Sequence, residues 1–315
     1  MEADPAGALG RICSRKEGLD REEMVASAIR IWAATNPQAA GEWIHAAPPE
    51  LRGDAVVQEL MEIWGRTEPE AAGEWLVTHD DPAVRTAVAE ILAGVWAEQD
   101  GESAVRWVSQ HWPDGEAGTA MHLALEVWAE TDGQGLRSRL GSLGDRDVEL
   151  EAAKALGDVM AERDGAAAWG FARSLDDPAA RDEASIVVME SWADRAPGDA
   201  ALAVSRIEDS DFRADASHTL VAKWILSDPG KAVDWIESQP EGPVADAGWD
   251  AAAEHSAMTK PFDALRYAVR IREPRLRLEA VESAYAEALA TDPEAAREWR
   301  AGIPSDLRSS LSGHD

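Results

Sequence analysis

Tryptophan recurs at a fixed interval of 32 residues along most of this chain. It occupies six multiples of 32, which are Trp32, Trp64, Trp96, Trp128, Trp192 and Trp224. The other multiples carry Met160, Ser256 and Ala288. A second aromatic position follows 11 residues later and holds Trp43, Trp75, Trp107, Phe171, Trp235, Tyr267 and Trp299, whereas Arg139 and Ala203 interrupt this series. Because a constant period of this length is typical of stacked supersecondary units, it constrains the fold more than any other feature.

A helix start is predicted between the two aromatic positions of each repeat. Proline recurs there at one phase, as Pro5, Pro37, Pro69, Pro197, Pro229, Pro261 and Pro293, and is replaced by Gly101, Gly133 and Gly165. The preceding residue is usually a good N-cap: Asp4, Asn36, Asp100, Asp132, Asp164, Asp228 or Asp292. An N-cap oxygen accepts hydrogen bonds from free N–H groups of the first turn, and proline at the first position gives up an N–H that has no partner. Each site therefore predicts a second helix of about 11 residues.

The rest of the repeat also reads as helix. Three residues after the proline or glycine stands a small residue, at Ala8, Ala40, Ala72, Ala104, Ala168, Ala200, Ala232, Ala264 and Ala296, with Leu136 as the exception. An alanine kept at one place indicates close helix–helix approach. The segment before each multiple of 32 has apolar residues at helical spacing, for example Val57, Leu60, Met61 and Trp64, and predicts a first helix of about 15 residues.

One helical hairpin of 32 residues cannot bury its apolar face alone, so neighbouring hairpins must bury it for each other. We therefore expect a single all-α superhelical domain over residues 1–315, made of about nine to ten hairpins with half repeats at both ends. The least regular stretch is 132–147, which has four Gly and carries Arg139 in place of an aromatic residue. Because Gly inside a helix costs about 0.5–1 kcal/mol relative to Ala, this stretch predicts the least stable helix and a candidate point of flexing.

The formal net charge is -30, from 60 acidic and 30 basic residues. Such a field repels nucleic acid and anionic membranes and favours a partner with a basic segment. The single cysteine excludes an intramolecular disulfide and a thiolate metal cluster. The N-terminus lacks the pattern of a signal peptide, and no apolar run approaches the ~20 residues of a membrane helix, so a cytoplasmic location is expected.

The repeat resembles a known kind of helical repeat. The segments Trp32 to Trp43, Trp64 to Trp75, Trp96 to Trp107, Trp224 to Trp235 and Ala288 to Trp299 are similar to the Trp-Ala-x-x-Asp-Pro-x-Ala-Ala-x-x-Trp units of a family of bacterial α-solenoid proteins. The resemblance covers essentially the whole chain and implies a right-handed αα superhelix without a particular chemistry. The likeness to tetratricopeptide and HEAT-type repeats is looser. Those units are longer, at about 34 residues or more, and the Leu-Gly pair of the tetratricopeptide core is absent here.

The period-locked Trp residues are interpreted as core, so binding residues are sought where the pattern fails. The candidates for partner contact are His111, Trp112, Arg139, Arg266, Arg270, Arg272, Arg275 and Arg277. The last five form the one basic cluster, and a phosphate-binding role for them is opposed by the overall charge. Trp169 and Trp249 also lie off the period, and Trp249 is a candidate to replace the missing Trp at 256. His79 and His111 share a phase in adjacent repeats, which would bring them within about 10 Å of each other.

No metal-ligand spacing, phosphate loop, dinucleotide fingerprint or nucleophile motif is present, so neither a metal nor a cofactor is expected. The favoured hypothesis is a non-catalytic scaffold that binds a protein or peptide on an acidic surface. An alternative is a structural subunit that stacks on another copy through its terminal repeats. The third hypothesis, an enzyme that uses the solenoid as a platform, has the least support, because no catalytic constellation is evident.

Overall fold

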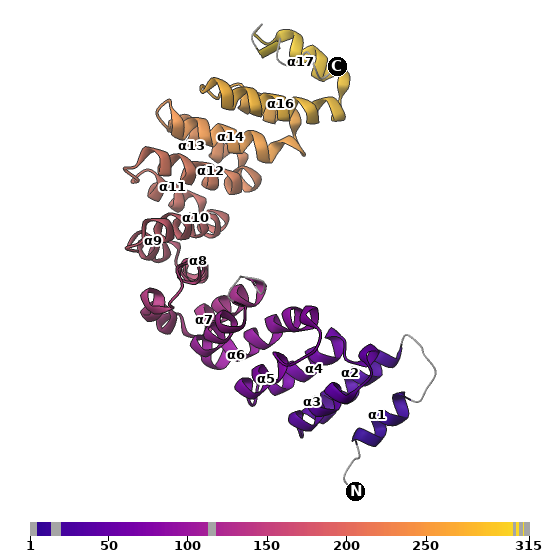
Figure 1. Cartoon of the computed structure of the whole chain (residues 1–315). Coiled ribbons are helices and arrows are strands. Elements are labelled where there is room, and N and C mark those ends of the chain that lie inside the picture. The colour runs from indigo at the N-terminus through magenta and orange to yellow at the C-terminus, as the bar shows by residue number, and fades with distance from the viewer. Residues whose placement is uncertain (1–4, 14–19, 113–117, 305–306, 309–310, 312–315) are drawn as a thin grey trace. The chain divides into compact units, whose positions relative to one another are not determined.

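The computed structural model describes residues 5–13, 20–112, 118–304, 307–308 and 311, and those residues form helices and connecting turns without a β-strand (Figure 1). The expected all-α class is confirmed. Internal contacts divide the chain into two compact units, 1–156 and 157–315. The division falls within α8 (Arg146–Arg163). Each unit is described by itself, and the expectation of one continuous domain stays a prediction.

Unit 1 is a succession of antiparallel helices. Its elements before α8 are α1 (Pro5–Cys13), α2 (Asp20–Ala33), α3 (Pro37–Ala46), η1 (Pro49–Leu51), α4 (Asp54–Trp64), α5 (Pro69–Leu76), α6 (Pro82–His111), α7 (Gly118–Arg139) and η2 (Leu140–Ser142). The backbone leaves the helical region once inside α6, at Asp100, and once inside α7, at Asp132. Each of these two therefore consists of two consecutive helices. The longer helices α2, α4 and α6 pack side by side, and α3 and α5 pack against them.

Unit 2 repeats this arrangement with longer first helices. After α8 come α9 (Gly165–Arg173), α10 (Pro178–Arg195), α11 (Pro197–Val204), α12 (Ser210–Ser227), α13 (Pro229–Ser238), α14 (Pro243–Ala257), α15 (Pro261–Ala268), α16 (Pro274–Thr291) and α17 (Pro293–Gly302). The helices α10, α12, α14 and α16 form one layer in sequence order, and the shorter odd-numbered helices pack against it (Figure 1).

The predicted helix starts are confirmed. The shorter helices begin at Pro37, Pro69, Gly165, Pro197, Pro229, Pro261 and Pro293, and the bends in α6 and α7 directly precede Gly101 and Gly133. The residue before each start has one backbone conformation, as in Asn36 (φ -156, ψ 81) and Asp228 (φ -144, ψ 81). Where that residue is Asn or Asp, its side chain accepts a first-turn N–H, as when Asn36 Oδ1 accepts from Ala39 at 3.0 Å. Local capping chemistry thus sets where each second helix begins.

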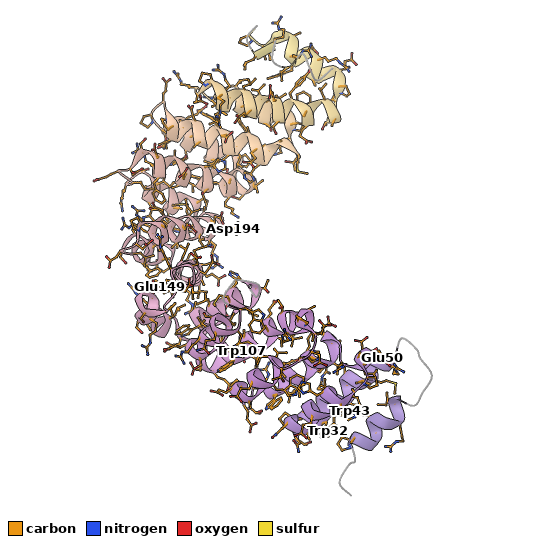
Figure 2. The ribbon with its side chains drawn as sticks, in the orientation of Figure 1. Trp32, Trp43, Glu50, Trp107, Glu149 and Asp194 are labelled. Atoms are coloured by element: carbon orange, nitrogen blue, oxygen red, sulfur yellow. The ribbon has the colours of Figure 1, made fainter. Side chains whose placement is uncertain are left out.

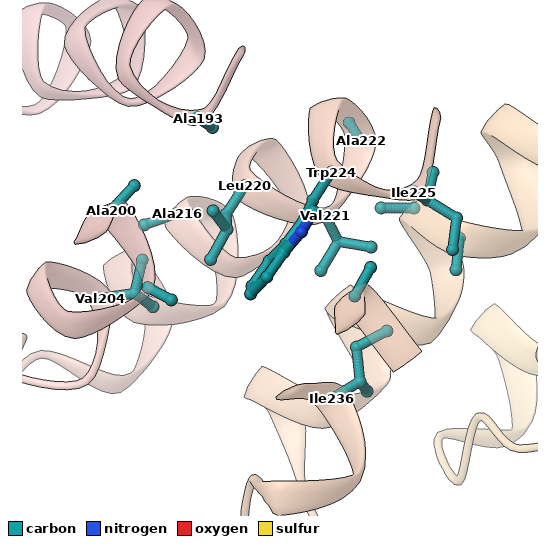
Figure 3. Close-up of a cluster of buried hydrophobic side chains, with 14 of the residues drawn as sticks. Ala193, Ala200, Val204, Ala216, Leu220, Val221, Ala222, Trp224, Ile225 and Ile236 are labelled. Carbon is teal, nitrogen blue, oxygen red and sulfur yellow. The ribbon is translucent and has the colours of Figure 1, made fainter. Parts of the chain in front are cut away.

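The aromatic series packs as the spacing predicts. The two aromatic rings of a repeat lie against each other, at 6.3 Å for Trp64 and Trp75 and 5.8 Å for Trp96 and Trp107. In unit 2 Trp224 packs on Trp235 at 6.4 Å and is surrounded by buried aliphatic side chains (Figure 3). Ala8 is partly buried, and the other alanines three residues after a helix start are fully buried: Ala40, Ala72, Ala104, Ala168, Ala200, Ala232, Ala264 and Ala296. The Trp residues at multiples of 32 are therefore chiefly core residues.

Two off-period rings replace missing tryptophans. Trp249 stacks on Tyr267 at 5.9 Å, and Tyr285 lies 6.2 Å from Trp299. Ser256 and Ala288 stand where the period would place the indole. The aromatic contact between the two helices of a repeat is thus kept, although the ring on the first helix comes from a different position of that helix.

Candidate functional site

The basic cluster is matched by acids or by backbone carbonyls. Each of its five arginines has a partner on the same or a neighbouring helix: Arg266 with Asp263, Arg270 with Glu237, Arg272 with Glu241, Arg275 with Glu279, and Arg277 with the carbonyl of Ile271. Arg270 also lies over the ring of Trp249, 4.3 Å from its centre. An anionic ligand would have to displace these acids, which opposes the phosphate interpretation.

Arg277 belongs to a wider pattern in which an arginine after the turn donates to a carbonyl of the preceding helix end. Arg85 Nη1 donates to the His79 carbonyl at 2.6 Å, and Arg308 Nη2 donates to the Ile303 carbonyl at 2.7 Å. These guanidinium groups satisfy carbonyls that a helix C-terminus leaves without intrahelical partners. The recurring arginines are thus accounted for by the fold.

The other predicted contact residues are also engaged within unit 1. Trp112 packs edge-on against Trp107 at 5.2 Å, and its Nε1 donates to Thr86 Oγ1 at 3.2 Å. His111 is exposed, and its Nδ1 lies 2.9 Å from the Trp107 carbonyl. Arg139 pairs with Glu102 at 3.1 Å. Figure 2 labels Trp107, around which Trp112 and His111 gather. These residues belong to unit 1, whereas the arginines of 266–277 belong to unit 2.

The hollow of interest lies elsewhere, in unit 2. It is an open hollow of about 680 Å³ between α9, α11 and the turn that follows α11, and it is lined by Trp169, Arg173, Ala203, Arg206, Ile207, Glu208 and Asp209. We call it the α9–α11 hollow. Its volume falls in the range of ligand-binding clefts, about 300–1,000 Å³. Trp169 and Ala203, both exceptions to the sequence pattern, contribute its apolar wall.

Trp169 and Ala203 reverse an arrangement found in unit 1. There, a glycine on one second helix makes room for the Trp of the next second helix. A Cβ on Gly41 would lie 2.8 Å from Nε1 of Trp75, so only glycine fits. The same arrangement recurs at Gly73, where a Cβ would lie 2.7 Å from Nε1 of Trp107. At the corresponding pair in unit 2, the preceding helix carries the indole, as Trp169, and the following helix carries only a methyl group, as Ala203.

Trp169 is held by its neighbours but remains half-buried. It stacks on Phe212 at 6.3 Å with an interplanar angle of 20°. Arg173 lies over the same Phe212 ring, 4.7 Å from its centre, and pairs with Asp182 at 3.1 Å. The indole is thus positioned by the Phe212 ring, over which Arg173 also lies, while part of the indole surface lines the hollow.

The charges around the hollow are formally balanced, with two arginines and two acids in its lining. Asp209 is engaged as the N-cap of α12, where Oδ1 accepts from the N–H of Asp211 and of Phe212. Within the described part of the chain, neither Arg206 nor Glu208 has an ion-pair partner. The rim therefore offers one cation and one anion to a bound molecule.

The surface beside the hollow carries no charge on two consecutive second helices. Gly170 is exposed with open space around it, and Leu202 is 59 % exposed. Six other repeats place a charged residue at this phase, whereas Gly10 and Ser138 are uncharged; the charged residues are Glu42, Glu74, Arg106, Asp234, Arg266 and Glu298. Uncharged exposed surface of this kind beside a hollow is typical of an interaction surface.

Two histidines and a tryptophan form a separate cluster in unit 1. His45 stacks on Trp75 at 4.5 Å and lies 6.2 Å from His79, which is almost fully buried. His79 Nδ1 accepts from the Asp81 N–H at 3.3 Å. The Nε2 atoms of His45 and His79 are buried without a hydrogen-bond partner among the described residues. Burial lowers the pKa of His45, the nearby His79 and Arg52 lower it further, and Asp80 acts in the opposite direction.

Acidification is expected to destabilise unit 1 through His45. Unfolded His45 takes up a proton near its ordinary pKa of about 6.5, whereas folded His45 does so only at lower pH. Its stabilising contribution is therefore complete above about pH 6.5 and is lost as the pH falls through the folded pKa. The variant His45→Phe keeps a ring on Trp75 but cannot titrate. Between about pH 7.5 and pH 5, its thermal midpoint should fall by roughly 1–2 °C less than that of the native chain. Equal pH dependence of the two proteins would contradict the assignment.

A further titratable cluster links α12 to α14 at the surface. His218 Nε2 lies 3.4 Å from Glu254 Oε2 and 3.8 Å from Asp250 Oδ2. Burial raises the pKa of Asp250, His218 lowers it, and Glu254 and Glu279 raise it. In the described ranges, no group of three or more His, Cys, Asp or Glu side chains is arranged to hold a metal ion. Nor does any helix there combine the length and apolar character that a membrane crossing requires.

Comparison with protein-family models, with curated proteins and with solved structures found no match for this chain. Function therefore has to be argued from the residues themselves. The sequence interpretation noted that Trp169 is off the period and that Ala203 interrupts the aromatic series, but it did not join the two. The signal that could have done so is their 34-residue spacing, which is also the spacing of Gly41 from Trp75 and of Gly73 from Trp107.

Proposed function

We propose that this chain is a non-catalytic scaffold that binds a segment of a partner protein at the α9–α11 hollow and the uncharged surface beside it. The proposed architecture is a right-handed αα superhelix of about nine to ten hairpins, supported within each unit by the two helix layers and the recurring helix starts. A scaffold of this kind offers long helical surfaces for binding, and its specificity comes from local departures from the repeat.

The observation that carries the proposal is the combination of a half-buried, positioned indole with exposed apolar surface. Trp169 is fixed by Phe212, and Leu202 projects into solvent one residue before Ala203. Tryptophan is among the residues that most often carry binding energy, especially where neighbours hold it in place. The acidic surface favours partners in which this apolar contact is flanked by basic residues, because a net charge of -30 attracts them from a distance.

Panning a displayed library of random 12-residue peptides against the intact chain tests this proposal. Selected peptides are expected to bind saturably, to be rich in Lys or Arg, and to bind more weakly at about 500 mM salt than at about 50 mM. Leu202→Ala should weaken binding by about 5–30-fold, as truncation of a central interface residue does. Leu226→Ala is the matched control, because Leu226 is a similarly exposed leucine of unit 2 on the first-helix layer.

Two outcomes would contradict the proposal. One is that the library yields no peptide with saturable binding. The other is that the selected peptides bind the Leu202→Ala and Leu226→Ala variants equally well, which would place the binding surface elsewhere.

A further inference from the structure

We infer that the α9–α11 hollow receives an aromatic side chain of the partner segment, which packs against the part of the Trp169 indole that lines the hollow. This inference rests on the proposed function and names the kind of side chain that the hollow binds. It is argued from the aromatic pattern, from the lining charges and from the shape of the wall.

The aromatic pattern shows what is missing at this place. The residue 11 positions after Trp64, Trp96 and Trp224 is a Trp whose ring packs on the first one. The residue 11 positions after Trp192 is Ala203. Trp192 correspondingly stays half-buried, whereas Trp64, Trp96 and Trp224 are at most 6 % exposed. Trp192 does not line the hollow, so a ring supplied by a partner above Ala203 would pack against Trp169 instead.

The lining charges favour an uncharged side chain in the interior. Arg173 and Arg206 are balanced by Glu208 and Asp209, so neither a free cation nor a free anion gains a net attraction there. Arg173 is in addition held by Asp182. The rim residues Arg206 and Glu208 are left to contact the backbone or the flanking residues of the partner.

An aromatic side chain fits this wall better than an aliphatic one of similar size. Trp169 offers an indole surface on one side, and the guanidinium of Arg206 can lie over the face of a bound ring. Aromatic pairs and cation–π contacts add attraction beyond the burial of apolar area. An aliphatic side chain would gain only from the burial of its apolar area. The floor, Ala203 and Ile207, is apolar and nearly buried.

The test uses blocked amino acids as probes of the intact chain. N-acetyl-tryptophanamide should bind with a dissociation constant of about 0.1 to a few mM, measured by ligand-detected NMR. N-acetyl-leucinamide should bind about 2–10-fold more weakly. The indole N–H signal of Trp169, assigned with Trp169→Phe, should shift with the bound fraction of N-acetyl-tryptophanamide.

Variants then locate the binding. Ala203→Leu fills the hollow and should weaken the binding of N-acetyl-tryptophanamide by about tenfold or more. Ala286→Leu, at an exposed alanine of α16, should leave this affinity unchanged. Should Ala203→Leu not fold, as judged by its thermal transition, Trp169→Leu is used instead, and the same loss is expected.

Three results would overturn the inference. These are no saturable binding of N-acetyl-tryptophanamide, equal affinity for N-acetyl-leucinamide, or unchanged affinity in a folded Ala203→Leu or Trp169→Leu variant. Failure of the inference is distinguishable from failure of the proposed function. If panned peptides lose affinity in Leu202→Ala but depend on an aliphatic anchor, the scaffold proposal stands and the aromatic assignment falls.

Discussion

The double variant Trp169→Gly/Ala203→Trp is expected to be more stable than the sum of its two single changes predicts. It recreates in unit 2 the arrangement of Gly73 and Trp107, in which the indole of the following helix fills the space above a glycine. The Trp169→Gly change alone removes the stack on Phe212 and places glycine inside α9, at a cost of about 2–4 kcal/mol. In the Ala203→Trp change alone, the new indole cannot pack as Trp107 does, because the Cβ of Trp169 stands where Gly73 leaves room; we expect a cost of about 1–3 kcal/mol.

The double-mutant cycle measures the compensation directly. Because each single change removes or crowds the same ring position, the coupling free energy should be about 1–3 kcal/mol in the favourable direction. It is obtained from urea unfolding of the native chain and the three variants, with a check that the slope with denaturant is unchanged. If the loss in free energy of unfolding of the double variant equals the sum of the two single losses within about 0.5 kcal/mol, Trp169 and Ala203 do not share one packing position.

Gly165→Ala and Gly170→Ala are expected to change stability in opposite directions, although both lie on α9. A Cβ on Gly165 would lie 2.3 Å from ring atoms of Trp192, a half-buried side chain that packs against the core. We expect a loss of about 1–3 kcal/mol from this crowding. Gly170 has nothing within 4 Å of its Cβ position, so Ala there should stabilise the helix by about 0.5–1 kcal/mol.

The substitution and the helix are the same in both variants, so the variants differ in what the new Cβ meets and in the position of the glycine within α9. Unfolding in urea or by heat should separate the two variants by about 1.5–4 kcal/mol. A Gly165→Ala protein as stable as Gly170→Ala would mean that the contact between Gly165 and Trp192 is not the reason for glycine at this N-terminal position.

Much of the fold could be predicted because its determinants are local. An Asn or Asp followed by Pro or Gly sets a helix start by capping, wherever the rest of the chain lies. The place of Trp64 or Trp224 in the core also follows from spacing, because a residue repeated at one phase meets the same neighbours in each repeat. Trp249 lies off this phase, and its role could be anticipated only from the Trp that is missing at position 256.

The predicted binding residues fared differently, because partner contacts depend on which side chains the fold already engages. The arginines from 266 to 277 look like a free basic patch in one dimension. In three dimensions Glu237 and Glu241, which lie about one repeat earlier in the chain, pair with two of them. Trp112 likewise looks exposed in a turn but packs on Trp107. Long-range pairing of this kind is invisible to a reading of local pattern.

The sequence by itself determined the helical class, the period and the helix starts, because propensity, capping and spacing act within a few residues. Only the tertiary structure decided that Trp169 and Ala203 meet across α9 and α11 and leave a hollow between them. Whether a ring fills a space or lines an opening depends on the residue facing it 34 positions away, and that pairing exists only once neighbouring helices have packed.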